Sequence, residues 1–159
     1  DDIKPENLVV SFDLKAPTHR HKMYDQYKAN RKGMPNELAE QLPIIKEVLQ
    51  AMNICIIEKE GYEADDILGT LAKWGQANDL EVTILTGDRD SVQLGDDEGL
   101  TTILIPSKGE IVKYNKQEVF EKMEVYPNQI VDYKALCGDS SDNIPGIRGI
   151  GPKSASSLL

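Results

Sequence analysis

The chain has 159 residues, of which 40% are hydrophobic, and it carries a formal net charge of −9. This length corresponds to about one domain with a core of its own. No apolar run approaches the ~18 residues of a membrane span, and we see no secretory signal pattern, so we expect no membrane association. Cys55 and Cys137 form no CxxC pair, which suits a reducing cytosol better than a disulfide scaffold.

Predicted strands and helices alternate along the chain. Apolar runs indicate strands, and apolar residues at helical spacing indicate helices. In chain order we expect a strand at 8–12, a helix at 36–52, a strand at 54–57, a helix at 64–77, a strand at 81–86, a hairpin over 101–105 and 110–114, and helices at 116–123 and 127–137. Pro43 should kink the first helix or split it in two. The alternation predicts an α/β fold with a mostly parallel sheet flanked by helices.

Eight acidic residues follow the ends of these predicted elements. In open parallel sheets the ligand site lies outside the carboxyl ends of the strands, so we expect the eight to converge on that edge. They are Asp13, Glu63, Asp65, Asp66, Asp88, Asp90, Asp139 and Asp142. Each cluster also has a simpler explanation. The helix dipole favours acids in a first turn, and the stretches 86–90 and 138–143 are compatible with ordinary polar turns.

Carboxylates that crowd together would repel one another and have raised pKa values. Divalent cations remove this difficulty, because hard oxygen ligands are the ones that Mg²⁺ takes. The sequence offers no cluster of Cys and His that would favour zinc. The acids therefore predict a site for two or more Mg²⁺ ions, with Mn²⁺ able to substitute.

A basic strip between Lys15 and Lys32 contains six of the 18 basic residues and only one acid, Asp25. Beside a metal cluster such a strip would guide phosphates, and Tyr24 or Tyr27 would be available to stack on a base. The alternative is a solvated surface. His19 and His21 also lie here. They are general-acid candidates by residue type, but we expect them only to contact phosphate or solvent.

The stretch I-P-G-I-R-G-I-G-P-K-S-A occupies residues 144–155. Gly149 and Gly151 permit a tight turn, and Pro152 is suited to start a helix whose positive end favours anions. Arg148 and Lys153 are placed to reach phosphates. The pattern resembles the helix-hairpin-helix, which grips a DNA backbone without reading bases. The alternative is a glycine-rich turn that only joins two helices.

Several motifs in order resemble the flap endonuclease family, and within it the 5′-nuclease (5′-3′ exonuclease) domains of bacterial DNA polymerase I. The motifs are F-D at 12–13, T-H-R at 18–20, Y-K-A-N-R at 27–31, G-Y-E-A-D-D at 61–66, T-G-D-R-D-S-V-Q-L at 86–94 and G-D-S-S-D-N-I-P-G-I-R-G-I-G at 138–151. The resemblance covers essentially the whole chain. It implies a PIN-like fold, a nucleoid-associated protein of the bacterial cytoplasm, and metal-dependent hydrolysis of DNA with 5′ flaps and of RNA primers in replication and repair.

The resemblance also implies roles for individual residues. One metal site would use Asp13, Glu63, Asp65 and Asp66, and a second would use Asp88, Asp90, Asp139 and Asp142. The residues expected to be catalytic are Asp13, Arg20, Lys28 and Asp66. The residues expected to bind DNA are Arg20, Tyr27, Lys28, Arg31, Arg148, Gly149, Ile150, Gly151 and Lys153. The mechanism it implies is two-metal hydrolysis, in which a metal-bound water attacks the phosphorus in line.

The domain organisation follows from the same resemblance. We expect a PIN-like catalytic core at 1–126, with an arch segment at 14–32, and a truncated helix-hairpin-helix subdomain at 127–159. The chain opens without Met and stops inside a helical pattern, so we expect a piece of a longer protein that carries a polymerase domain. The family's first strand, with its own metal-binding aspartate, would precede residue 1. We expect the parent to be active and leave open that this piece alone is inactive.

Two other functions stay open at this point. A PIN-type ribonuclease would share the acid cluster but would not need the terminal helix-hairpin-helix. A non-catalytic DNA-binding module would need that hairpin but not the acids.

Overall fold

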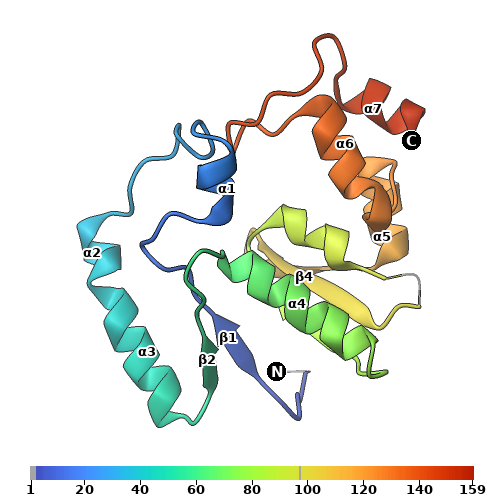
Figure 1. Cartoon of the computed structure of the whole chain (residues 1–159). Coiled ribbons are helices and arrows are strands. Elements are labelled where there is room, and N and C mark those ends of the chain that lie inside the picture. Colours follow the sequence, from blue (N-terminus) through green and yellow to red (C-terminus); the bar gives the residue numbers. More distant parts are fainter. Residues whose placement is uncertain (1–2, 97) are drawn as a thin grey trace.

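The computed structural model describes residues 3–96 and 98–159. Its strands form two small sheets (Figure 1). In the first, β1 (Val9–Ser11) pairs in parallel with β2 (Cys55–Ile57). In the second, β3 (Val82–Leu85) pairs in parallel with β4 (Thr101–Ser107), and β4 pairs antiparallel with β5 (Glu110–Tyr114). The predicted strands and hairpin are therefore present, and two of the three pairings are parallel.

The mostly parallel arrangement is divided, because the described residues show no hydrogen-bonded pairing between the two sheets. Helix α4 (Ala64–Gln76) connects them, since it contacts both β1 and β3. Its inner side buries Ile67, Ala72 and Gly75. Glu63, Asp65 and Asp66 stand at the start of this helix, which is in contact with both sheets.

The predicted helix over 36–52 is split in two, as Pro43 led us to expect, but the break lies earlier. Helix α2 (Asn36–Ala39) ends at Glu40, and α3 (Gln41–Ala51) follows directly. Pro43 sits in the first turn of α3, where a backbone N–H has no intrahelical partner and proline costs little. All residues of these two helices are described and none is buried, so they form an arm on the outside of β1 and β2 (Figure 1).

The main hydrophobic core lies around the three-stranded sheet. It joins β3 and β4 to α4, to the 3₁₀-helix η1 (Arg89–Leu94), to α5 (Lys116–Met123), to the 3₁₀-helix η2 (Pro127–Gln129) and to α6 (Ile130–Cys137). The buried residues of this core are Ala72, Ile84, Val92, Ile103, Ile105, Val119, Val125 and Ile130. The predicted helix over 127–137 begins as η2 and continues as α6. No helix among the described residues is long and apolar enough to cross a membrane.

The C-terminal part consists of α6 and α7 (Pro152–Leu158), which contact each other across the loop 138–151. Helix α7 begins at Pro152, as predicted, and Gly149 has a positive φ of 88° in the turn before it. Within the loop the chain crosses itself where Gly138 meets Gly146. Two hydrogen bonds of 2.8 Å between the backbones of Asp139 and Ile144 close the crossing. The loop 138–146 is thereby a closed ring that presents its acids at a defined place.

We predict that Gly146→Ala destabilises the protein, because an added Cβ would lie 2.3 Å from the carbonyl carbon of Cys137 and 2.4 Å from the amide nitrogen of Gly138. Backbone atoms cannot move aside as a flexible side chain can, so we expect the free energy of unfolding to fall by about 1–3 kcal/mol. Urea denaturation measures this. Gly33→Ala is the control, since nothing lies within 4 Å of its added Cβ. Equal midpoints for the two variants would contradict the crossing.

Candidate functional site

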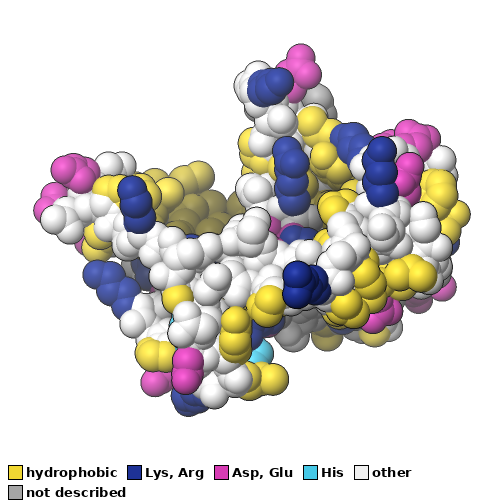
Figure 2. All heavy atoms as spheres, turned by 90° about the horizontal axis from the view of Figure 1, so that it is seen from above, with side chains coloured by type: hydrophobic (Ala, Val, Ile, Leu, Met, Phe, Trp, Pro, Cys, Tyr) yellow, Lys and Arg dark blue, Asp and Glu magenta, His cyan; other side chains and the backbone are white. Residues whose placement is uncertain are grey.

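One pocket gathers the predicted acids. It lies between the segment that carries Arg20 to Lys28, the start of α4, η1 and α6. Seven of the eight acids line it, namely Glu63, Asp65, Asp66, Asp88, Asp90, Asp139 and Asp142. Asp13 lies beside them, because its Oδ1 accepts a 2.7 Å hydrogen bond from the backbone N–H of Ala64. Seen from above, the surface is hollowed between projecting lobes that each carry Lys or Arg side chains (Figure 2).

Asp66 is held by Arg20. Helix α1 (His19–Met23) carries Arg20, whose two terminal nitrogens donate to the two oxygens of Asp66 at 2.8 and 2.6 Å. This two-pronged geometry is among the stronger ion pairs available to proteins. The hydrogen bond from Arg20 holds the pKa of Asp66 below its usual value. Asp66 also accepts from the backbone N–H of Glu63 at 2.8 Å, which caps α4.

Glu63 is buried, with only 8% of its surface exposed. Its carboxylate accepts from the hydroxyl of Tyr27 at 2.9 Å and from Nζ of Lys28 at 2.8 Å. Burial by itself would raise the pKa of Glu63, but the hydrogen bonds from Lys28 and Tyr27 outweigh burial, so the pKa is lowered. Burial, followed by the bond to Glu63, raises the pKa of Tyr27. Tyr27 and Lys28, which we predicted to bind DNA, therefore donate hydrogen bonds to Glu63 in this structure.

The segment around Arg31 docks on the acidic loop. Arg31 pairs with the carboxylate of Asp142 and also donates to the backbone oxygen of Ser141 at 3.3 Å. The backbone N–H of Lys28 donates to the Asp142 carbonyl at 2.9 Å. The side chain of Asn30 donates to the Ser140 carbonyl at 2.7 Å. More than 100 residues separate these partners in sequence. The predicted arch segment is therefore held against the loop 138–146 by hydrogen bonds and one ion pair.

Lys134 of α6 bridges two of the acids. Its Nζ lies 2.6 Å from Oδ1 of Asp90 and 2.6 Å from Oδ2 of Asp139. Although burial opposes the charge, the bonds to Asp139 and Asp90 raise the pKa of Lys134 to about 12. Burial would raise the pKa of Asp139, but the hydrogen bonds from Lys134 and Ser141 lower it far below its usual value. For Asp90 burial outweighs the bond from Lys134, and the pKa is raised.

Three acids have no such cation. In the part of the chain that the structure describes, Asp13, Asp65 and Asp88 form no ion pair with a basic side chain. Burial of the carboxyl group, followed by repulsion from Asp88 and Asp13, raises the pKa of Asp65 to about 6. Negative charge is therefore uncompensated around Asp65.

The donor set fits hard divalent cations. The potential metal ligands among the eight acids are all carboxylate oxygens, the type that Mg²⁺ takes. Uncompensated negative charge remains around Asp65. Within residues 3–96 and 98–159, no three acidic, His or Cys side chains already surround a single point as metal ligands would. The ion pairs account for this, since Arg20, Lys28, Arg31 and Lys134 occupy carboxylates that a cation would need.

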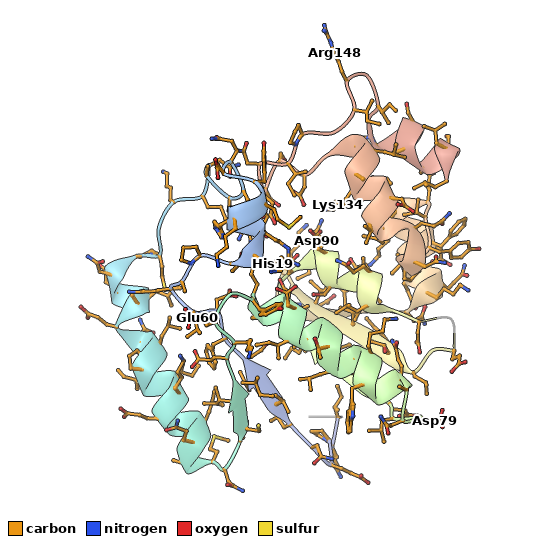
Figure 3. All side chains as sticks on the ribbon, in the orientation of Figure 1. His19, Glu60, Asp79, Asp90, Lys134 and Arg148 are labelled. Atoms are coloured by element: carbon orange, nitrogen blue, oxygen red, sulfur yellow. The ribbon has the colours of Figure 1, made fainter. Side chains whose placement is uncertain are left out.

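The predicted hairpin residues lie outside the pocket. Arg148 projects from the tip of the loop before α7, away from Asp90 and Lys134 (Figure 3). Gly149, Gly151 and Lys153 are also exposed, and Ile150 is half-buried. The structure therefore presents two separate surfaces. One is an acidic pocket whose carboxylates pair with basic side chains, and the other is an exposed turn with Arg148 and Lys153.

The two histidines do not line the pocket. Nδ1 of His19 lies 3.2 Å from the Gly61 carbonyl, and its ring packs on Tyr62. The ring of His21 caps α1 through Thr18. Both histidines therefore make local contacts with protein groups.

Sequence reasoning missed Lys134, the residue that joins two acidic segments. The available signal was its position in a helix that leads directly into G-D-S-S-D-N, five residues before Asp139. A basic side chain in the last turn of this helix lies close to the acids of the loop that follows.

Comparisons with known proteins agree with this geometry. Residues 1–124 match the family model described as 5′-3′ exonuclease, N-terminal resolvase-like domain, and residues 125–159 match its C-terminal SAM fold. The chain is 48% identical to DNA polymerase I of Caldicellulosiruptor bescii and 46% identical to that of Bacillus subtilis. These alignments cover 98% and 100% of the chain, but only 19% and 18% of the relatives.

Solved structures share the fold. A phage T5 5′-exonuclease with bound zinc ions matches with a TM-score of 0.79 at 24% identity, over 96% of this chain and 59% of that one. A phage T5 flap endonuclease in a pseudo-enzyme-product complex with DNA and metal ions matches with a TM-score of 0.78 at 22% identity, again over 96% and 59%.

We predict that Asp65 makes the stability of the cation-free protein depend on pH. Its raised pKa of about 6 in the folded state exceeds the ~3.9 of an unfolded chain, so the folded state binds more protons between these values. Stability should therefore fall as the pH rises from about 4 through 6. Asp65→Asn should abolish this fall and stabilise the protein at pH 7 by about 1 kcal/mol. The amount is reduced because Asp65, although its carboxyl group lies in the pocket, remains accessible to solvent that screens its interactions.

Urea unfolding in EDTA at pH 4 and pH 7 measures the effect. Asp79→Asn is the control, since Asp79 lies beyond the far end of α4 (Figure 3). If Asp65→Asn changed stability equally at both pH values, the raised pKa of Asp65 would not be the cause of the pH dependence.

Proposed function

The chain belongs to the 5′-3′ exonuclease family, and on this premise we propose that it is the divalent-metal-dependent 5′ nuclease of a bacterial DNA polymerase I. The observation that carries the proposal is the pocket in which seven carboxylates from separate segments converge, with three acids at the site lacking a cationic partner. Its substrates would be DNA with 5′ flaps and RNA primers, cut by hydrolysis of a phosphodiester during replication and repair.

The proposal assigns the metals to the carboxylates. Asp13, Asp65 and Asp88 are the donors available without rearrangement, and the remaining five would join as their ion pairs exchange partners. When bound, two Mg²⁺ ions supply a water of lowered pKa and stabilise charge on the leaving oxygen, and Mn²⁺ would substitute. Arg20 holds Asp66 in place, and Lys28 and Tyr27 hold Glu63.

The same proposal gives the basic residues a second partner. Arg20, Tyr27, Lys28 and Arg31 border the acids, so they are placed to meet the phosphates of a strand that enters the pocket. Arg148, Gly149, Ile150, Gly151 and Lys153 would hold the duplex part of the substrate through its backbone.

We also propose the organisation that the sequence predicted. The core would extend over 1–126, including the arch segment at 14–32, and the helix-hairpin-helix subdomain over 127–159. A polymerase domain in the same parent chain would be its partner, because the chain spans about a fifth of the polymerase relatives. The protein would act in the bacterial cytoplasm at the nucleoid.

The two rivals are separable by substrate. A PIN-type ribonuclease would cut single-stranded RNA, and a non-catalytic helix-hairpin-helix module would bind duplex DNA without cutting it. The pocket of carboxylates favours an enzyme, and the exposed turn with Arg148 favours a DNA substrate.

We predict that the parent protein cleaves a 5′-flap DNA with Mg²⁺ and does not cleave it in EDTA. Asp65→Asn should reduce the cleavage rate about a hundredfold or more, because a metal ligand is removed. Asp79→Asn should cleave like the unmodified protein.

Mg²⁺ or Mn²⁺ should also raise the unfolding free energy, by ~2.7 kcal/mol at a hundredfold excess over Kd. Preferential cleavage of single-stranded RNA, or melting curves that are identical with EDTA and with Mn²⁺, would contradict the proposal.

We predict that the turn binds duplexes of every sequence alike. Arg148→Gln and Lys153→Gln should weaken duplex binding, and each lost phosphate contact should flatten the slope of log K against log salt by ~0.9. Lys4→Gln is the matched control, because Lys4 is exposed near the end of the chain that lies far from the turn (Figure 1). Unchanged affinity and slope for both turn variants would reduce the turn to a connector between helices.

A further inference from the structure

Lys134 occupies an unusual position among the basic residues of the pocket. Arg20, Lys28 and Arg31 come from the arch segment at 14–32, whereas Lys134 belongs to α6. Its Nζ stands 2.6 Å from an oxygen of Asp90 and 2.6 Å from an oxygen of Asp139. Asp90 belongs to η1 and Lys134 to α6, two elements in contact, and Figure 3 shows the two residues close together. The ammonium therefore links the strand-end acids to the acids of the loop after α6.

This position is the one that a divalent cation shared by Asp90 and Asp139 would need. Both would place positive charge between the same two carboxylates, and both cannot occupy that space together. The remaining oxygen of Asp139 is also engaged, since it accepts from the backbone and hydroxyl of Ser141 at 2.8 and 2.6 Å. A cation that arrives must therefore replace the ammonium rather than join it.

The ammonium cannot vacate the space by losing its proton. A lysine side chain is charged at neutral pH, and both of its partners here are carboxylates, so it leaves only by rotating away. Its side chain is 30% exposed, which gives the flexible stem a path toward solvent. Exchange with a divalent cation is then a competition between two positive charges for the same carboxylates.

We propose that Lys134 is a built-in competitor for one metal position, which holds Asp90 and Asp139 together in the cation-free protein and sets how tightly a divalent cation binds there. The inference rests on the proposed metal site and deepens it. It gives Lys134 two effects of opposite sign, since the lysine stabilises the cation-free protein and weakens the binding of the cation.

The test is isothermal titration of the chain with Mn²⁺ at constant ionic strength. Lys134→Met keeps most of the apolar stem and removes the charge. Loss of one charge-assisted contact should tighten the Kd of one site by roughly tenfold, and the shift in melting temperature on adding Mn²⁺ should grow. Lys134→Arg keeps the charge and should bind Mn²⁺ nearly like the unmodified protein. Lys46→Met is the matched control, since Lys46 pairs with Glu58 at a similar side-chain exposure of 28% but does not line the pocket.

A second measurement needs no variant. In the unmodified protein the ammonium of Lys134 should give an NMR signal protected from exchange by its two bonds, and adding Mg²⁺ should abolish that protection. If Lys134→Met binds Mn²⁺ no more tightly than Lys46→Met does, or if the ammonium stays protected at saturating Mg²⁺, Lys134 is only a structural ion pair. If no variant binds Mn²⁺ at all, the metal site itself is wrong and the inference falls with it.

Discussion

Repulsion among carboxylates at the ends of parallel strands is the constraint on which the arrangement of this molecule depends. The capping of α4, the docking of the arch segment and the bridge made by Lys134 all place positive charge or N–H donors against these acids. Several of the contacts join segments more than 100 residues apart in sequence. The acids of the pocket thus organise the surrounding chain, because the basic residues that supply the compensating charge come from separate segments.

Local patterns made much of the fold predictable. The strand β3, the hairpin of β4 and β5, and helices α4 and α5 follow from apolar runs and from apolar residues at helical spacing. The division into two sheets was not predictable, because a strand pattern does not specify which neighbour a strand pairs with. The break at Glu40 rather than Pro43 reflects how well the first turn of a helix tolerates proline.

The site was predictable as a set of acids but not as a set of pairs. Placing carboxylates at strand ends needs only topology, and this rule accounts for Asp66 and Asp88, whereas Asp139 reaches the same pocket from the loop after α6. Which cation meets which acid depends on side-chain directions that sequence spacing does not encode. The basic strip was predicted to face phosphate, yet Arg20, Lys28 and Arg31 lie against acids. Phosphate and carboxylate attract the same groups, so one strip can serve both in turn.

The arm formed by α2 and α3 has a consequence for how the molecule moves. These helices bury no side chain, and Ile44, Val48 and Met52 remain at least half exposed. Unwinding them would therefore uncover little new apolar surface, and the core around β3 and β4 would be untouched. Stability in proteins is distributed among cooperative units that open separately. The arm should therefore open at a low free-energy cost. Its backbone amides should exchange with solvent long before those of α4. The arch segment, which precedes the arm in sequence, would then become more mobile while the rest of the fold stays intact.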